Sequence, residues 1–202
     1  MSRYVYLASQ SPRRLELLRQ IGLSPVVLTL RHTGARADVD ETPLPAEKAM
    51  DYVLRLAEAK ARAGLMAMAG RRLMSLPIVA ADTTVTLDGA ILGKPANPAE
   101  AADMLRRYSG RTHSVLTAVS VAYQDQVKLA LSESTVRFRV LEEREIALYV
   151  DSAESFDKAG GYAIQGRAAT FIEHISGSYS GVMGLPLFET SELLKSVGCA
   201  VL

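Results

Sequence analysis

The segment Ile78–Pro95, which reads IVAADTTVTLDGAILGKP, places opposite charges on a short strand–turn–strand pattern. Its small and apolar start ends at Asp82, so we predict that this carboxylate leaves the end of a buried strand. The pair Asp88-Gly89 favours the two-residue turn of a β-hairpin, and Lys94 follows the returning strand. A carboxylate and an ammonium in these positions suit a divalent metal and a phosphate chain. We therefore predict that the chemistry is centred on this segment.

A second group of polar residues follows the apolar run Tyr4–Ala8, which we predict to be a strand. Ser9 and Ser11 come directly after it, and Ser11 is suited to cap a helix whose first turn contains Arg13 and Arg14. The free N–H groups of such a turn and two guanidinium groups favour an anion. An ordinary capped helix with solvated arginines explains the same pattern, and the residues alone leave the two interpretations level.

Three further candidates carry a weaker signal. Glu41 lies in the acidic run Asp38–Thr42, where a carboxylate could reach a metal but a solvated loop is the simpler interpretation. Lys60 lies near the edge of the apolar stripe of a predicted helix, Ala46–Ala69, and is more typical of a surface lysine whose stem packs on that stripe. The segment Asp157–Gly166 combines paired glycines with Asp, Lys and Gln side chains, a composition that lets backbone approach a ligand closely.

The composition argues against several classes of protein. The 202 residues are 49% hydrophobic and carry a formal net charge of +1, which predicts a folded chain without a general surface for nucleic acid. The lone Cys199 excludes an internal disulfide, and the apolar runs are shorter than the ~20 residues of a membrane span. We therefore expect a soluble, cytoplasmic protein with no membrane partner. His113, far in sequence from the other histidines, is expected to be structural.

The order of the predicted strands and helices indicates one layered α/β domain over residues 1–202, because no linker divides the chain. The chemistry-bearing segments each end or interrupt a β-rich run, so we expect them to meet in a crevice on one rim. Neither a P-loop nor a G-x-S-x-G nucleophile elbow is present. Carboxylates, cations, hydroxyls and glycine-exposed backbone instead suit a metal-bound polyphosphate.

Eight motifs, spread in order along nearly the whole chain, resemble those of the Maf family. They read LASQSPRRLELL, DVDET, YVLRLAEAKA, AADTTV, ILGKP, SGRTHSVLTAV, DKAGGYAIQG and GSYSGVMGLPL. The resemblance implies a nucleoside triphosphate pyrophosphatase, which cleaves between the α and β phosphates to give a monophosphate and pyrophosphate. It also implies the fold shared with inosine triphosphate pyrophosphatases, an elongated, mixed and bent sheet with flanking helices in two lobes around a cleft.

The same resemblance implies roles for individual residues. Asp82 matches the catalytic proton acceptor that activates water. Glu41 matches the acidic residue that helps Asp82 hold a divalent metal, with Mg²⁺ expected and Mn²⁺ or Co²⁺ as alternatives. The positions that surround the triphosphate are Ser9, Arg13, Arg14, Lys60 and Lys94. Arg13, Thr83 and Gln165 match the positions linked to base choice, and their combination resembles the branch that acts on dTTP and UTP.

Two alternatives to this function stay open. The substrate could be a modified nucleotide such as 5-methyl-UTP, pseudo-UTP or 7-methyl-GTP, the last as in the branch of 7-methyl-GTP pyrophosphatases. A regulator of cell division that senses a nucleotide without turnover would be a different class, although it would not need a water-activating carboxylate beside the metal. A homodimer is an expectation from the family alone. Gly181 and Met183 depart from the commoner form of the last motif, but the acidic and basic site residues are intact.

Overall fold

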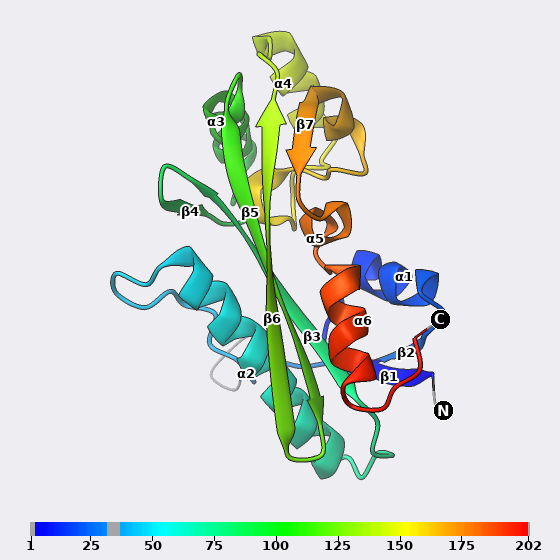
Figure 1. Ribbon diagram of the computed structural model, residues 1–202. Helices are drawn as coiled ribbons and strands as arrows, with labels where there is room; N and C mark the ends of the chain where they lie inside the picture. Colours follow the sequence, from blue (N-terminus) through cyan, green and yellow to red (C-terminus); the bar gives the residue numbers. More distant parts are fainter. Residues whose placement is uncertain (1–2, 32–36, 202) are drawn as a thin grey trace.

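The computed structural model describes residues 3–31 and 37–201, which form a seven-stranded mixed sheet with flanking helices (Figure 1). The strands are β1 (Tyr4–Leu7), β2 (Ser24–Val27), β3 (Ile78–Leu87), β4 (Ala90–Leu92), β5 (Thr112–Tyr123), β6 (Gln126–Phe138) and β7 (Ile172–Ser176). The helices are α1 (Pro12–Gln20), α2 (Ala49–Gly70), α3 (Pro98–Tyr108), α4 (Glu143–Asp151), α5 (Tyr179–Met183) and α6 (Leu187–Lys195), with 3₁₀ turns η1 (Ala159–Gly161) and η2 (Arg167–Phe171). The predicted mixed α/β fold is confirmed.

The sheet has the strand order β2-β1-β3-β5-β6-β7, and β4 pairs with β3 as a hairpin. β1 pairs in parallel with β2 and β3, whereas the other pairs are antiparallel. The long strands β5 and β6 run the length of the molecule, and α3 and α4 lie together at one end (Figure 1). A separate hydrophobic core around Tyr108, Phe138 and Tyr162 supports that end. In the described part of the chain, no helix has the length and apolar character needed to cross a membrane.

Two local features predicted from the sequence are confirmed. Ser11 is the N-cap of α1, where its side chain accepts a hydrogen bond from Arg14 N, and a proline occupies the first turn of the helix. Asp88 and Gly89 have φ values of 54° and 77°, and they form the two-residue turn between β3 and β4. Both features depend on residues that are close in sequence, so the local pattern was sufficient to find them.

Asp82 does not leave the end of a strand, and that prediction was wrong. β3 continues as one strand to Leu87, and Asp82 pairs with Ala118 of β5 in its middle. The threonines that follow Asp82 are β-branched and favour a continued strand. On the other edge, β1 pairs with β3 only at Ile78 and Val79, and β4 begins to pair at Val85. Asp82 therefore lies in a gap between two short neighbours on that edge of β3.

Successive residues of β3 face different cores, as the pleat of a strand requires. Ala80 belongs to a core that includes residues of α2, whereas Ala81 belongs to a core that includes residues of α1 and α6. In Figure 1, α2 lies on one side of the sheet, and α1 and α6 lie on the other. Continuing this alternation, Asp82 faces α2 and Thr83 faces α1, so two adjacent residues serve opposite sides of the sheet.

Candidate active site

A cavity of about 870 Å³ opens at the gap in the sheet. Its walls come from the loop after β1, the first turn of α1, the acidic loop before α2, the middle of β3, the end of β4 and the segment that precedes η1. It is lined by every residue predicted to hold the metal or the triphosphate: Ser9, Arg13, Arg14, Glu41, Lys60, Asp82 and Lys94. Residues far apart in sequence are therefore brought to one site, as the sequence predicted.

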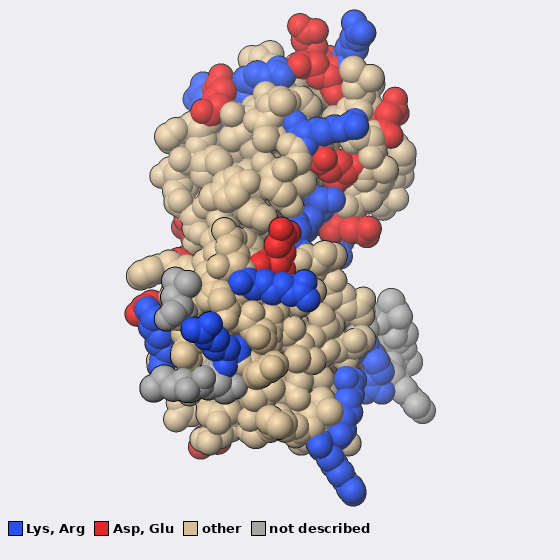
Figure 2. Space-filling view, turned by 90° about the vertical axis from the view of Figure 1, so that its right-hand side faces the viewer, with Lys and Arg blue, Asp and Glu red and all other residues tan. Residues whose placement is uncertain are grey.

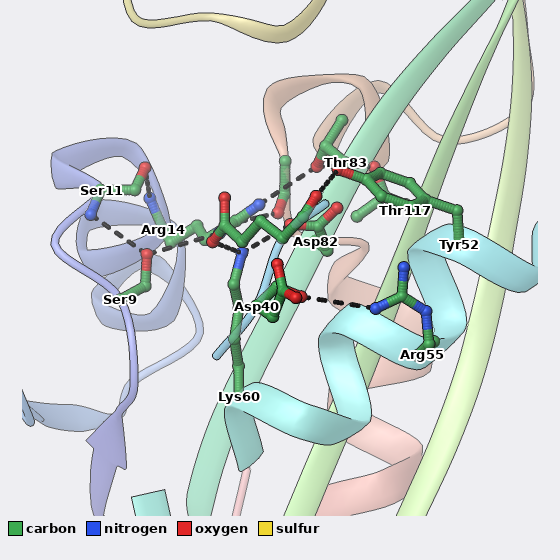
Figure 3. Close-up of polar contacts among 12 residues, drawn as sticks. Ser9, Ser11, Arg14, Asp40, Tyr52, Arg55, Lys60, Asp82, Thr83 and Thr117 are labelled. Carbon is green, nitrogen blue, oxygen red and sulfur yellow. Dashed lines mark hydrogen bonds and ion pairs between the residues drawn. The ribbon is translucent and has the colours of Figure 1, made fainter. Parts of the chain in front are cut away.

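Glu41 and Asp82 form the acidic centre of this cavity, and Lys60 contacts both of them. Lys60 Nζ lies 2.7 Å from Asp82 Oδ1 and 2.8 Å from Glu41 Oε1, so a single ammonium joins both carboxylates (Figure 3). The Lys60 side chain is 9% exposed and that of Asp82 is 13% exposed, whereas Glu41 is 47% exposed at the mouth. The simpler sequence interpretation of Lys60, a surface lysine, is therefore wrong. Its neighbour Ala61 packs in the core, and Lys60 turns from the same helix towards Asp82.

The acidic loop is held in place by two residues of α2 that the sequence analysis missed. Tyr52 donates a hydrogen bond from its hydroxyl to the backbone oxygen of Glu41 at 2.9 Å. Arg55 donates to the backbone oxygen of Asp40 at 3.4 Å (Figure 3). It also donates to the backbone oxygen of Thr42 at 3.1 Å. These contacts fix the backbone on both sides of Glu41 and at Glu41 itself. Tyr52 lies about two turns before Lys60 on the helix, and Arg55 lies about one and a half turns before it.

Arg14 uses its guanidinium to connect three segments. Its Nε donates to Gly184 O at 2.7 Å, and its two terminal nitrogens donate to Thr83 Oγ1 at 3.2 Å and to Ser9 Oγ at 3.4 Å. Burial lowers the pKa of Arg14 from its ordinary value, and the nearby charge of Asp82 opposes that change. Gly184 follows α5 with a φ of 115°. Arg14 therefore ties the end of α5 to the middle of β3 while it lines the cavity.

A smaller cavity of about 60 Å³ lies beside the first one. It is lined by Arg13, Thr83 and Gln165, the three residues predicted to govern base choice. Thr117 lies behind it and donates a bifurcated hydrogen bond, to Thr83 Oγ1 at 3.1 Å and to Gly181 O at 2.8 Å. The residues that line both cavities are Ser11, Arg13, Arg14, Thr83 and Lys158. The two cavities are therefore adjoining parts of one site.

His113 lies in the core beneath the smaller cavity. Its Nε2 is 2.7 Å from the hydroxyl of Tyr162, which itself lines that cavity. Burial lowers the pKa of His113 to about 4, so the imidazole is neutral near pH 7. Its ring packs against Tyr108 and Phe138. These contacts agree with the structural role expected for His113, since they place it in the core and not on the cavity wall.

The carboxylates at the site suit a hard divalent cation. In residues 3–31 and 37–201, no group of three or more His, Cys, Asp and Glu side chains is placed to hold a metal. Glu41 and Asp82 are nevertheless close enough to share one ammonium. Mg²⁺ is commonly bound by one or two carboxylates together with water and substrate phosphates. The donor set therefore fits a cation that is held jointly by the protein and a polyphosphate.

The charges that line the larger cavity favour an anion. Its lining contains the cations Arg13, Arg14, Lys60, Lys94 and Lys158 and the carboxylates Glu41, Asp82 and Asp157, so the cations are in excess. Elsewhere the signs are mixed: on the face shown in Figure 2, acidic and basic side chains are interspersed without a continuous basic surface. The cavity therefore carries an excess of positive charge, as binding of a compact polyanion requires.

The chain is similar to a protein family, to named relatives and to a solved structure. The family model described as "Maf-like protein" matches residues 4–197. A protein of Nitrosomonas europaea named dTTP/UTP pyrophosphatase is 54% identical over 198 residues, which are 98% of this chain and 96% of the relative. A protein of the same name from Nitrosospira multiformis is 56% identical over 192 residues, or 95% and 93% of the two chains. Among solved structures, the Staphylococcus aureus Ham1 protein matches 67% of this chain and 71% of that chain with a TM-score of 0.43 and 15% identity.

Proposed function

This chain belongs to the Maf-like protein family, and we propose that it is a nucleoside triphosphate pyrophosphatase that hydrolyses dTTP and UTP. The products are the nucleoside monophosphate and pyrophosphate. The observation that carries the proposal is the position of Asp82 and Glu41. They share one ammonium inside a cationic cavity that adjoins the small cavity lined by Arg13, Thr83 and Gln165. One part of the site suits a triphosphate, and the other suits a base.

Asp82 is the residue we propose as the proton acceptor. It lies inside the cavity on a rigid strand and faces Glu41 across Lys60. Asp82 takes a proton from water as the water oxygen attacks the phosphoanhydride link, and the bond between the α-phosphate and pyrophosphate breaks. Such general-base help is worth about 10²–10⁴-fold, so most of the acceleration must come from stabilising charge on the phosphoryl oxygens.

The remaining charged residues supply that stabilisation in our proposal. Arg13, Arg14 and Lys94 bring positive charge and hydrogen-bond donors to the triphosphate, and Ser9 adds a hydroxyl. Glu41 and Asp82 would hold a divalent cation, with Mg²⁺ the best match to an oxygen donor set of this kind. When bound, the cation neutralises charge on the phosphate chain. Lys60 lies between Glu41 and Asp82 and keeps these two carboxylates close together.

We propose that the smaller cavity recognises the base of the nucleotide. Arg13, Gln165 and the hydroxyl of Thr83 offer donors and acceptors to the polar edge of a pyrimidine. Thr117 and Arg14 hold the Thr83 hydroxyl from two sides, so its orientation is set before the substrate arrives. A site whose hydrogen-bonding groups are fixed in this way discriminates against bases that leave them unpaired.

The test is pyrophosphate release from a panel of triphosphates in the presence of Mg²⁺. We expect the highest kcat/KM with dTTP and UTP, and lower values with dCTP, dGTP and 7-methyl-GTP. Asp82→Asn is expected to keep its fold and to lose a factor of about 10²–10⁴ in kcat.

Asp125→Asn, in the exposed turn between β5 and β6, is the matched control and is expected to behave as the unchanged protein. Near-normal turnover in Asp82→Asn would remove Asp82 from the mechanism. Binding of triphosphates without any pyrophosphate release would instead favour a nucleotide sensor.

A further inference from the structure

Part of the lining of the larger cavity comes from the segment between α4 and η1. This segment contributes Ala153, Phe156, Asp157 and Lys158 to the lining. Four of the five residues that line both cavities come from the N-terminal end of α1 and from β3, and Lys158 is the one that comes from this segment. Lys158 therefore lies at the junction of the two cavities, close enough to Arg13 for their charges to interact.

The backbone beside Lys158 is held firmly. Lys158 is the N-cap of η1, and Gly160 N within that turn donates to Gly93 O at 2.9 Å. Gly160 has a φ of 75°, and a Cβ at this position would lie 2.6 Å from Val85 Cγ2. The turn is thus pressed against β3 and tied to the residue that precedes Lys94. Lys158 consequently extends from a fixed point, as a residue that positions a ligand must.

The ammonium of Lys158 has unused capacity to bind. Among the described residues, its Nζ donates one hydrogen bond, to Phe156 O at 3.3 Å, and no carboxylate lies within ion-pair distance. An ammonium group carries three donors. Burial, followed by the positive charge of Arg13, lowers the pKa of Lys158 from its ordinary value, and the negative charges of Glu154 and Asp157 oppose that change. An anionic ligand between Lys158 and Arg13 would reduce the repulsion between these two cations.

We propose that Lys158 binds the phosphate that carries the nucleoside. This inference rests on the proposed function, because that function places the base in the smaller cavity and the triphosphate in the larger one. The phosphate at their junction is then the α-phosphate, which is also the one retained in the monophosphate product. Lys158 binds it from the segment before η1, and Arg13 and Arg14 bind it from α1, so cations from two separate elements hold the α-phosphate. The β and γ phosphates lie further into the larger cavity, away from Lys158.

Two products separate these contacts, because dTMP contains the α-phosphate and inorganic pyrophosphate does not. Their Kd values are measured by calorimetry with Mg²⁺ for the unchanged protein, Lys158→Gln and Lys158→Arg. A charge-assisted hydrogen bond is worth about 1.5–3 kcal/mol, so we expect Lys158→Gln to raise the Kd of dTMP by at least about tenfold. The Kd of pyrophosphate is expected to change less than about twofold. Lys158→Arg keeps a cation and is expected to stay within about threefold of the unchanged protein.

Lys195→Gln, which removes an exposed lysine of α6, is the control and is expected to change neither Kd. Equal weakening of dTMP and pyrophosphate, or no weakening of either, would overturn the assignment. So would an arginine variant that binds dTMP as poorly as the glutamine variant, because the role would then be structural. The proposed function fails separately, if the unchanged protein releases no pyrophosphate from dTTP while its affinity for dTMP still depends on Lys158.

Discussion

Replacing Lys60 by methionine tests how far the acidic centre depends on one ammonium. Lys60 Nζ lies 2.7 Å from Asp82 Oδ1 and 2.8 Å from Glu41 Oε1. The two oxygens are therefore at most about 5.5 Å apart, and at an effective dielectric constant of about 20 their repulsion without the lysine is roughly 3 kcal/mol. Removing one partner of a fully buried ion pair costs about 3–5 kcal/mol. Because Glu41 is 47% exposed, we expect the free energy of unfolding to fall by less, about 2–3 kcal/mol.

We expect Mg²⁺ to reverse much of this loss. In Lys60→Met the cation enters between two carboxylates without displacing an ammonium, whereas in the unchanged protein it must share them with Lys60. A ligand that binds only the folded state adds about 2.7 kcal/mol at one hundred times its Kd. The assay is urea unfolding followed by circular dichroism at about pH 7.5, first in EDTA and then across a Mg²⁺ titration.

Arg62→Met is the control for this experiment. Arg62 lies on the same helix and forms an exposed pair with Glu58, so its loss is expected to cost no more than about 0.5 kcal/mol and to leave the response to Mg²⁺ unchanged. The reasoning is refuted if Lys60→Met unfolds like the unchanged protein in EDTA. It is equally refuted if Mg²⁺ stabilises the two proteins by the same amount, since the ammonium would then not occupy the cation's position.

Three further predictions concern the edge, the base pocket and the acidic loop of the site. Lys94→Ala removes an exposed cation at the cavity. We expect kcat/KM for dTTP to fall by about 10–100-fold with an unchanged melting temperature. An unchanged rate with a lower melting temperature would instead assign Lys94 a structural role. Arg14→Lys keeps the charge but loses the planar guanidinium that holds Thr83 and Gly184 at once. We therefore expect the kcat/KM for dTTP divided by that for dCTP to fall by about tenfold. An equal fall in kcat/KM for both substrates would contradict this prediction. Arg55 holds the pKa of Glu47 at about 2, so stability from this pair is complete above about pH 4.5 and is lost as the pH falls from there towards 2. In urea unfolding, the free energy of unfolding of Glu47→Gln should not show this loss between about pH 4.5 and 2. If the unchanged protein and Glu47→Gln show the same dependence of stability on pH, the Arg55–Glu47 pair is not its cause.

The parts of the fold that the sequence predicted correctly depend on neighbouring residues. The Ser11 cap and the Asp88-Gly89 turn each need only a few residues of fixed type, and the structure contains both. The position of Asp82 was wrong, because an apolar run shows where a strand is buried but not where its pairing stops. That information lies in the short ladders of β1 and β4, which are set by contacts between segments distant in sequence.

The same distinction applies to the site. All nine residues inferred from the family resemblance line the two cavities, so residue type within long motifs was informative. The residues that were missed act through their place in the fold. Tyr52 and Arg55 matter because their side chains reach the backbone of the acidic loop. Lys158 matters because a turn packed against β3 brings it to the junction of the two cavities. Neither arrangement has a signature in the local sequence.

The gap on the edge of β3 explains how two adjacent residues that face opposite sides of the sheet both line the connected cavities. Asp82 faces α2 and reaches Lys60, whereas Thr83 faces the other side and reaches Arg14 and Thr117. Along most of a sheet, a neighbouring strand covers this edge of the strand and separates the spaces on the two sides of the sheet. Here β1 has ended and β4 has not yet begun, so both side chains open on connected cavities. In our proposal, base and phosphate belong to one covalent substrate, and the peptide bond fixes Asp82 relative to Thr83. A base that shifts at Thr83 should therefore also shift the phosphate relative to Asp82. Base selection should therefore affect kcat as well as KM.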